Sequence, residues 1–426
     1  MMRLGQTALA ALLLTACTPM SDQVGSQISA PGQADEVTDI DALHQSLVVY
    51  DSHLDIPAIF HTADYDFGAR GSYEEDRTQV DLPRMKEGGL DGGFWVIYTA
   101  QGPLTDVAYR AARNQSLMRM TSIRELTAKY HEDLELAFTA DDADRIISEG
   151  KRVVFQSMEN AYPLGEDVSL LETFYIGGLR MVSPAHFRNN QFGDSATDVS
   201  AQHDGLSPLG EELVREANRL GLILDGSHVA DSTVEDMLEL STTPIILSHS
   251  GPKAIYGHPR NVPDELLLRI AEDGGVIQIN ALGAYLEALE PTPERAAGLA
   301  EIAAEFGTDF ASMSPETIAQ VRAARRALDA VHPAPRSTFE KYLEHVFYTI
   351  ELVGIDHVGI GADWDGGGGV EGMSDITDLP KVTQALLDAG YDEEDLAKFW
   401  GGNMMRLLRE VEAAKTAEIG SPNIVN

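Results

Sequence analysis

Side chains that can bind metal ions recur at the ends of apolar, strand-like runs in this chain. The first run, residues 47–55, ends on His53 and Asp55, and because a strand has a period of two, both side chains leave the same face. A parallel barrel gathers the carboxyl ends of its strands at one mouth, so such positions can form one site. Later runs end at or next to Glu159, His186, His228, His249, Asn280 and Asp363.

Three imidazoles and two carboxylates of this set are suited to zinc. His228 and His249 end consecutive runs, and with His53, Asp55 and Glu159 they supply five ligands. A tetrahedral zinc with an open position needs fewer, so the surplus favours two metals that share a carboxylate. Glu159 is the candidate for the shared position, because no lysine closes the third or fourth run. The alternative is that these histidines are structural hydrogen-bonding groups.

A pair of metals predicts hydrolysis without a protein nucleophile. Two ions about 3.5–4 Å apart can hold a bridging hydroxide at neutral pH and polarise a carbonyl oxygen. A further carboxylate must carry the proton from the attacking water to the leaving nitrogen. Asp363 is favoured for this role because it lies nearer the end of the last run than Asp365, whose side chain leaves on the same face.

Eight strand-like runs alternate with amphipathic helical stretches, which predicts an α/β fold, a (β/α)8 TIM-like barrel of the metal-dependent hydrolase type. An extra short strand and helix are expected at 134–147. An Ala- and Glu-rich segment at 282–340 predicts an inserted helical segment after the seventh strand, where it can wall or cap the pocket. The eight runs are 47–55, 92–100, 153–159, 179–186, 222–228, 244–249, 275–280 and 357–363.

Composition limits the classes of partner. The 426 residues include 68 acidic and 31 basic ones, a formal net charge of −37. Such an acidic surface argues against nucleic acid or anionic lipid as partners. The chain is long enough for one large barrel. Its single cysteine, Cys17, excludes intrachain disulfides and a cysteine-based zinc site.

The N-terminal residues predict export. A short positive start is followed by the apolar run 8–14 and by Leu-Thr-Ala-Cys at 14–17, which resembles a bacterial lipobox with Cys17 as the lipidated residue. We therefore expect a lipoprotein-type signal peptide (1–16), a disordered tether (17–40), the barrel domain (41–415) and a C-terminal tail (416–426). The expected location is the bacterial cell envelope, lipid-anchored and facing the periplasm. The alternative is an ordinary signal peptide and a soluble periplasmic or secreted protein.

Eight motifs along the chain resemble, in order, those of one known family. The chain is similar to the membrane (renal-type) dipeptidases, the zinc peptidase family M19, from about Leu47 to Leu408. The motifs are DSHLD at 51–55, QVDLPRM at 79–85 with GGFW at 92–95, SMEN at 157–160, GLSPLG at 205–210, DGSHV at 225–229, SHS at 248–250, RNVPD at 260–264 and GADWDG at 361–366.

This resemblance implies a dipeptidase with two zinc ions per chain that acts on free dipeptides, including some with a D-residue at the C-terminus. It implies that His53 and Asp55 bind one zinc with Asp363 close by, that His228 and His249 bind the other, and that Glu159 bridges them.

The resemblance also implies how substrate is held. His186 is expected to stabilise the oxyanion, Arg260 to hold the substrate carboxylate through its guanidinium fork, and Asn280 to belong to the substrate pocket. A homodimer without a disulfide is expected.

Departures from the mammalian pattern concern the pocket. The chain reads Glu-Asn-Ala-Tyr at 159–162, residues 281–285 differ, and the segment 282–340 is long. These changes lie in the expected substrate pocket, so the resemblance does not predict which substrate side chains are preferred. One alternative function is another binuclear metal amidohydrolase on the same barrel, such as a lactonase, a deacetylase or a β-lactam hydrolase. Another is a non-enzymatic envelope lipoprotein. The sequence argues against it, because every expected ligand position holds a residue that can bind a metal.

Overall fold

The computed structural model describes residues 39–55, 65–308 and 313–417. The predicted signal peptide, Cys17, nearly all of the tether and residues 418–426 of the tail lie outside the described residues, so these assignments stay predictions. Within the described ranges, none of the helices combines the length and apolar character needed to cross a bilayer.

Eight parallel strands of the described residues close into a barrel. They are ordered β1-β2-β4-β5-β6 in one sheet and β7-β8-β9 in a second. Single parallel bridges join Asp225 to Ile246 and Leu54 to Trp364, which closes the ring and confirms the predicted barrel. The strands are β1 (Tyr50–Leu54), β2 (Gly92–Tyr98), β4 (Arg152–Glu159), β5 (Leu179–Val182), β6 (Ile223–Leu224), β7 (Ile246–Ser250), β8 (Val276–Ile279) and β9 (Val358–Ile360).

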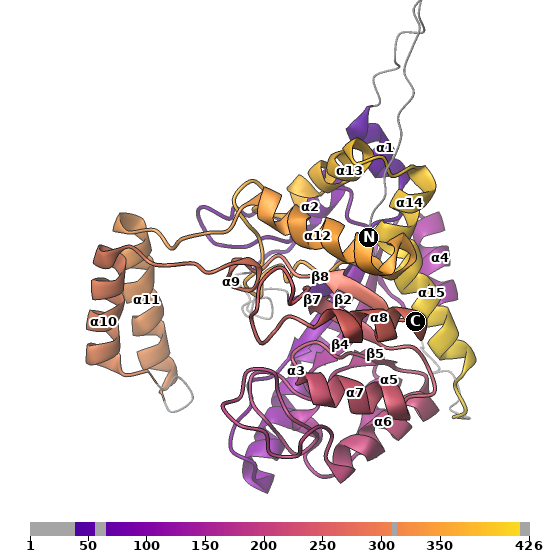
Figure 1. The fold of residues 1–426 in the computed structure, drawn as a ribbon, viewed down its shortest axis with the longest axis horizontal. Coiled ribbons are helices and arrows are strands. Elements are labelled where there is room, and N and C mark those ends of the chain that lie inside the picture. Colours follow the sequence, from indigo (N-terminus) through magenta and orange to yellow (C-terminus); the bar gives the residue numbers. More distant parts are fainter. Residues whose placement is uncertain (1–38, 56–64, 309–312, 418–426) are drawn as a thin grey trace, which may run out of the picture. The chain divides into compact units, whose positions relative to one another are not determined.

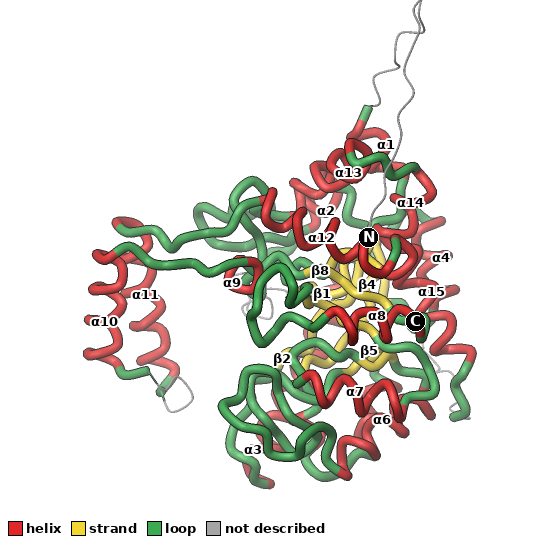
Figure 2. The backbone as a smooth tube through the Cα atoms, in the orientation of Figure 1, coloured by secondary structure: helices red, strands yellow, loops and turns green. Residues whose placement is uncertain are grey.

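Helices surround these strands (Figures 1 and 2). Their ends follow local sequence signals: α6 begins after Ser207, whose side chain accepts from the Gly210 N–H, and ends at Gly221 in the left-handed region with φ 72°. The helices are α1 (Ile40–Ser46), α2 (Leu82–Glu87), α3 (Asp106–Lys129), α5 (Leu170–Ile176), α6 (Pro208–Leu220), α7 (Asp231–Leu240), α8 (Asp264–Glu272), α12 (Phe339–Val353), α13 (Leu379–Asp388), α14 (Glu393–Ala397) and α15 (Asn403–Ala413).

Apolar side chains fill the barrel near the starts of its strands. Phe94 and Phe155 stack with ring centroids 5.0 Å apart, and they belong to one buried cluster with Ile223 of β6 and Val276 of β8. The same cluster includes apolar residues of α15, among them Leu408. Because this end is packed with hydrocarbon, the carboxyl ends of the strands are left for polar side chains.

Both predicted additions to the barrel are present. The extra strand and helix are β3 (Leu134–Leu136), which pairs with β4, and α4 (Ala140–Ser148). The segment after β8 contains α9 (Gly283–Leu286), α10 (Pro293–Phe306) and α11 (Pro315–Val331). The last two pack against each other, and Arg295 Nη1 donates to an Asp329 carboxylate oxygen at 2.7 Å.

Candidate functional site: a metal centre at the barrel mouth

The predicted ligands lie together at the carboxyl ends of the strands. Glu159, the last residue of β4, is the common member: its Oε1 lies 3.0 Å from His228 Nε2, 3.5 Å from His249 Nε2 and 3.7 Å from His53 Nε2. Three groups in the described chain have the spacing to hold a metal ion, and Glu159 belongs to two of them. They are His53–Glu159–His249, Glu159–His186–His228 and His53–Asp55–Asp363.

The backbone bends sharply to present two of these side chains. His228 follows β6 with φ 72° and Asp363 follows β9 with φ 63°, a left-handed conformation that costs a non-glycine residue energy. His228 lies four residues beyond the end of β6 and Asp363 three residues beyond the end of β9, and both line the cavity at the mouth. Strain of this kind is concentrated at functional sites.

The three imidazoles are held in the form that binds metals. Burial, with smaller contributions from Arg260 and His186, lowers the pKa of His53 to about 3. Burial likewise holds the pKa values of His228 and His249 well below their usual range. A neutral imidazole has a free ring nitrogen, and His53 Nε2 has no hydrogen-bond partner among the described residues.

The carboxylates repel one another at this site. Burial, followed by the charges of Asp55 and Asp363, raises the pKa of Glu159 well above its usual range. Burial and then Asp55 do the same to the pKa of Asp363, and burial raises the pKa of Asp55 to about 6. Three crowded carboxyl groups beside neutral imidazoles form a donor set that a divalent cation neutralises, so the residues fit a metal centre.

A small cavity of about 190 Å³ opens on this cluster. His186 is in its wall, and its Nε2 lies 3.6 Å from Glu159 Oε1. Burial lowers the pKa of His186 to about 3, so it is a neutral hydrogen-bonding group facing the cavity. The remaining wall residues include Tyr98, Phe187, Leu282 and Tyr285.

Comparison with known proteins decides the family. Residues 37–421 match the family model described as membrane dipeptidase, peptidase family M19. The chain belongs to this family. It is a metallo-dipeptidase, as the sequence motifs predicted.

Relatives support this assignment along most of their length. A dipeptidase of Claviceps purpurea, tcpJ, is 31% identical over 84% of this chain and 75% of its own. The probable dipeptidase PvdM of Pseudomonas aeruginosa is 31% identical, with a TM-score of 0.76 over 88% of this chain and 98% of its own. A metallopeptidase of Rhodobacter sphaeroides, solved with a phosphinate mimic of the dipeptide L-Ala-D-Ala, is 26% identical, with a TM-score of 0.66 over 86% and 99%.

Arg260 of this dipeptidase lies behind the cavity wall. Its Nη2 donates to the His249 carbonyl oxygen at 3.0 Å, and its guanidinium carbon lies 5.2 Å from the centre of the Tyr285 ring. The Nε atom has no hydrogen-bond partner among the described residues. Arg260 is therefore a buried guanidinium next to the cavity wall, with an Nε–H that is unpaired within the described part of the chain. Its role in binding the substrate carboxylate stays a prediction.

Asn280 is held by hydrogen bonds to neighbouring residues. Its Oδ1 accepts from the Leu282 N–H at 2.5 Å, its Nδ2 lies 3.4 Å from the His249 carbonyl oxygen, and its side chain also hydrogen-bonds to Asp363. Like Arg260, it is not among the residues that line the cavity, and its place in the substrate pocket stays a prediction. Because its amide is already used by these neighbours, Asn280 also positions Asp363.

Three further residues complete the comparison of the site with its sequence prediction: Asp365, Tyr98 and Phe187. Asp365, the rival of Asp363, accepts the Gln79 N–H at 2.8 Å and lies outside the cavity wall. Tyr98 and Phe187 line the cavity but were not predicted. Register could have revealed Tyr98, because it ends β2 opposite Glu159 in β4.

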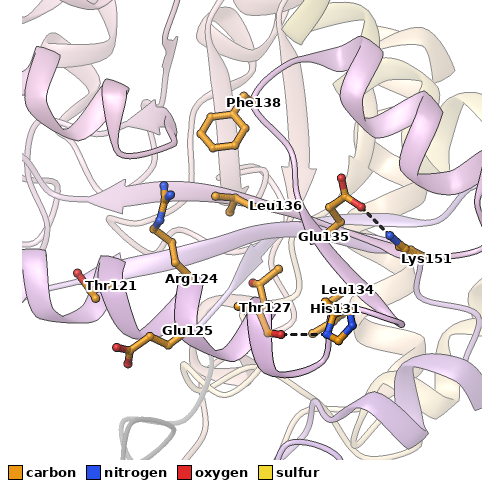
Figure 3. A pocket seen from close by; sticks show the side chains of 11 residues that line it. Thr121, Arg124, Glu125, Thr127, His131, Leu134, Glu135, Leu136, Phe138 and Lys151 are labelled. Carbon is orange, nitrogen blue, oxygen red and sulfur yellow. Dashed lines mark hydrogen bonds and ion pairs between the residues drawn. The ribbon is translucent and has the colours of Figure 1, made fainter. Parts of the chain in front are cut away.

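A wider hollow of about 750 Å³ is lined by residues of α3 and β3, among others (Figure 3). Its cations are already engaged: Lys151 pairs with Glu135 at 2.8 Å, and Arg124 Nη1 donates to the Gly177 carbonyl oxygen at 2.7 Å. None of the metal-type groups found in the described residues includes a residue of its wall. We therefore assign the chemistry to the smaller cavity.

Proposed function

We propose that this dipeptidase binds two zinc ions and hydrolyses free dipeptides, including those with a D-residue at the C-terminus. The observation that carries the proposal is the position of Glu159 in two of the three ligand groups. Imidazole and carboxylate together suit zinc, and the predicted ligands exceed the needs of one ion with an open position. They are His53, Asp55, Glu159, His228, His249 and Asp363. The Rhodobacter sphaeroides relative with its L-Ala-D-Ala mimic supports the stereochemical part.

Zinc, when bound, lowers the pKa of coordinated water and polarises a carbonyl oxygen. Glu159 would hold both ions, His53 and Asp55 one, and His228 and His249 the other. Asp363 would take the proton of the attacking water on its carboxylate and deliver it to the leaving nitrogen. Asp363 lies in the wall of the cavity, where a bound substrate would meet its carboxylate. His186, neutral and in the cavity wall, would donate its N–H to the developing oxyanion.

Arg260 would bind the C-terminal carboxylate of the dipeptide. A guanidinium pairs with a carboxylate through parallel N–H donors, and burial strengthens that pairing. A cavity of about 190 Å³ accommodates only a small substrate. Free dipeptides satisfy both conditions, whereas their C-terminal amides lack the charge.

A dipeptide panel tests the proposal. The zinc-loaded protein is incubated with L-Xaa-L-Xaa and L-Xaa-D-Xaa dipeptides and with the C-terminal amide of each, and product formation is measured. We expect cleavage of the free dipeptides of both stereochemistries and a loss of roughly 10²-fold or more in kcat/KM for the amides, because an unpaired buried cation is costly.

Two variants complete the panel. His249→Ala is expected to abolish cleavage, and His131→Ala, which replaces an exposed histidine outside the site, is expected to keep it. Equal cleavage of amides and free dipeptides would refute the role of Arg260. Two bound zinc ions without dipeptide cleavage would favour another amidohydrolase activity.

We also propose that the protein is exported and held in the cell envelope by a lipid on Cys17. The support is the apolar run at 8–14 and the lipobox-like residues 14–17. Expression in a bacterial host followed by fractionation and intact-mass analysis tests it. We expect the wild type in the membrane fraction with a diacylglyceryl mass on Cys17, and a Cys17→Ser variant outside it. An unmodified Cys17 in the mature protein would contradict the proposal.

A further inference from the structure

A buried hydrogen-bond chain runs from Asp225 to the ligand His249. Asp225 Oδ2 accepts the hydroxyl of Ser248 at 2.6 Å, and Ser248 Oγ lies 2.8 Å from His249 Nδ1. All three side chains are almost fully buried, so bulk water does not compete for these bonds. On the opposite side of the ring, His249 Nε2 lies 2.8 Å from His228 Nε2 and 3.5 Å from Glu159 Oε1, so an unprotonated His249 Nε2 accepts from the His228 ring in the zinc-free protein.

The directions of these hydrogen bonds are fixed by the donors present. Asp225 Oδ1 accepts two backbone N–H groups, those of Ser227 and Ser248, each at 2.9 Å. With the Ser248 hydroxyl, three donors converge on this side chain, as they do on an ionised carboxylate. Ser248 has one proton and gives it to Asp225, so its oxygen is left to accept from His249.

We propose that Asp225, acting through Ser248, fixes His249 in the tautomer with its proton on Nδ1. The lone pair of Nε2 is then directed at the metal centre before any ion arrives. Asp225 and Ser248 are positioning residues, since neither faces the cavity. Partners of this kind set the orientation and basicity of metal-binding histidines, and their loss lowers metal affinity by roughly 10–100-fold. The inference rests on the proposed zinc site.

The Asp225→Asn substitution reverses the donor and acceptor directions of this hydrogen-bond chain and keeps the shape of the side chain. The Asn amide can donate to Ser248 Oγ, whose hydroxyl must then donate to His249 Nδ1. The ring proton moves to Nε2, where it blocks the metal. We expect ¹⁵N–¹H correlation spectra of the zinc-free, histidine-labelled full chain to show Nδ1–H for His249 in the wild type and Nε2–H in Asp225→Asn. A His249→Gln spectrum identifies the signals.

Asp51→Asn is the matched control. Asp51 is also a buried carboxylate, lies in the ligand strand β1 and accepts two backbone N–H groups, those of His53 at 2.8 Å and Ala362 at 3.1 Å. Its described bonds include none to a histidine ring, so its replacement is expected to leave the His249 tautomer unchanged. Zinc affinity, measured by competition with a chelator, should fall by roughly 10–100-fold more in Asp225→Asn than in Asp51→Asn.

Ser248→Ala is the second variant, and it tests the proposal if Asp225→Asn does not fold. It removes the hydroxyl that connects Asp225 to His249, so His249 should lose its single tautomer and show averaged nitrogen shifts. An Nε2–H tautomer in the wild type, or no difference between Asp225→Asn and Asp51→Asn in tautomer and affinity, would overturn the proposal. Because the tautomer is measured without zinc or substrate, a failure of the dipeptide panel would leave this test intact.

Discussion

Glu159→Gln will lower kcat/KM for a free dipeptide by roughly 10³-fold or more, about 4 kcal/mol of transition-state stabilisation. The side chain keeps its size but loses its charge, and its Oε1 is the atom that four ring nitrogens approach within 3.7 Å. An amide in this position binds zinc poorly and can direct an N–H group at the imidazoles, whose nitrogens must be free. Steady-state kinetics and zinc content by mass spectrometry measure both consequences.

Glu166→Gln provides the comparison for this substitution. Glu166 is exposed and follows β4 by only a few residues, so the same chemical change is made outside the cluster. It should keep the zinc content and kcat/KM of the wild type. If Glu159→Gln retained two zinc ions per chain and lost less than about tenfold in kcat/KM, Glu159 would not bridge the ions.

The barrel could be predicted because its strands are buried and evenly interrupted. Each of the eight runs coincides with one strand, and six of the observed strands end before their runs do, β4 and β7 being the exceptions. The run 222–228 contains only Ile223–Leu224 as strand. The reason lies in the site: after these residues the backbone turns to present Asp225 and His228, the latter with φ 72°. The periodicity of hydrophobic residues predicts where a strand begins better than it predicts where the strand ends and a functional loop begins.

The metal-type cluster could also be predicted, because parallel strands bring their carboxyl ends to one mouth whatever their spacing in the sequence. Arg260 required the family resemblance, since an isolated arginine after a strand carries no such signal. Asn280 shows the limit of both approaches: it ends a strand as expected, but its amide is used by Leu282 and Asp363. Phe187 was missed because an aromatic side chain reads equally as core or as pocket wall.

Removing zinc will destabilise the fold, and the loss will increase as the pH rises from about 6.5 to 8. Bound zinc at a thousand times its Kd contributes about 4 kcal/mol. In the zinc-free protein the folded pKa values of Asp55, about 6, and of Glu159 and Asp363, well above the usual range, exceed their unfolded values. Such groups stabilise the fold at low pH, and this contribution is lost as the pH rises through their folded pKa values.

The histidines affect the stability of the zinc-free fold in the opposite direction and in a different pH range. The folded pKa of His53 is about 3, and those of His228 and His249 are also lowered, so they destabilise the fold only as the pH falls below about 6.5, where the unfolded chain takes up protons. Above that pH the histidines no longer contribute to the slope, and the site carboxylates determine how the zinc-loaded and zinc-free proteins differ.

Scanning calorimetry of zinc-loaded and chelator-treated protein across this range should therefore show a difference in Tm that widens with pH. Glu159→Gln removes one of the three carboxylates and should flatten the zinc-free curve. A difference that narrows toward pH 8 would mean that the carboxyl groups are ionised and compensated without a metal, by Arg260 or by one another's hydrogen bonds.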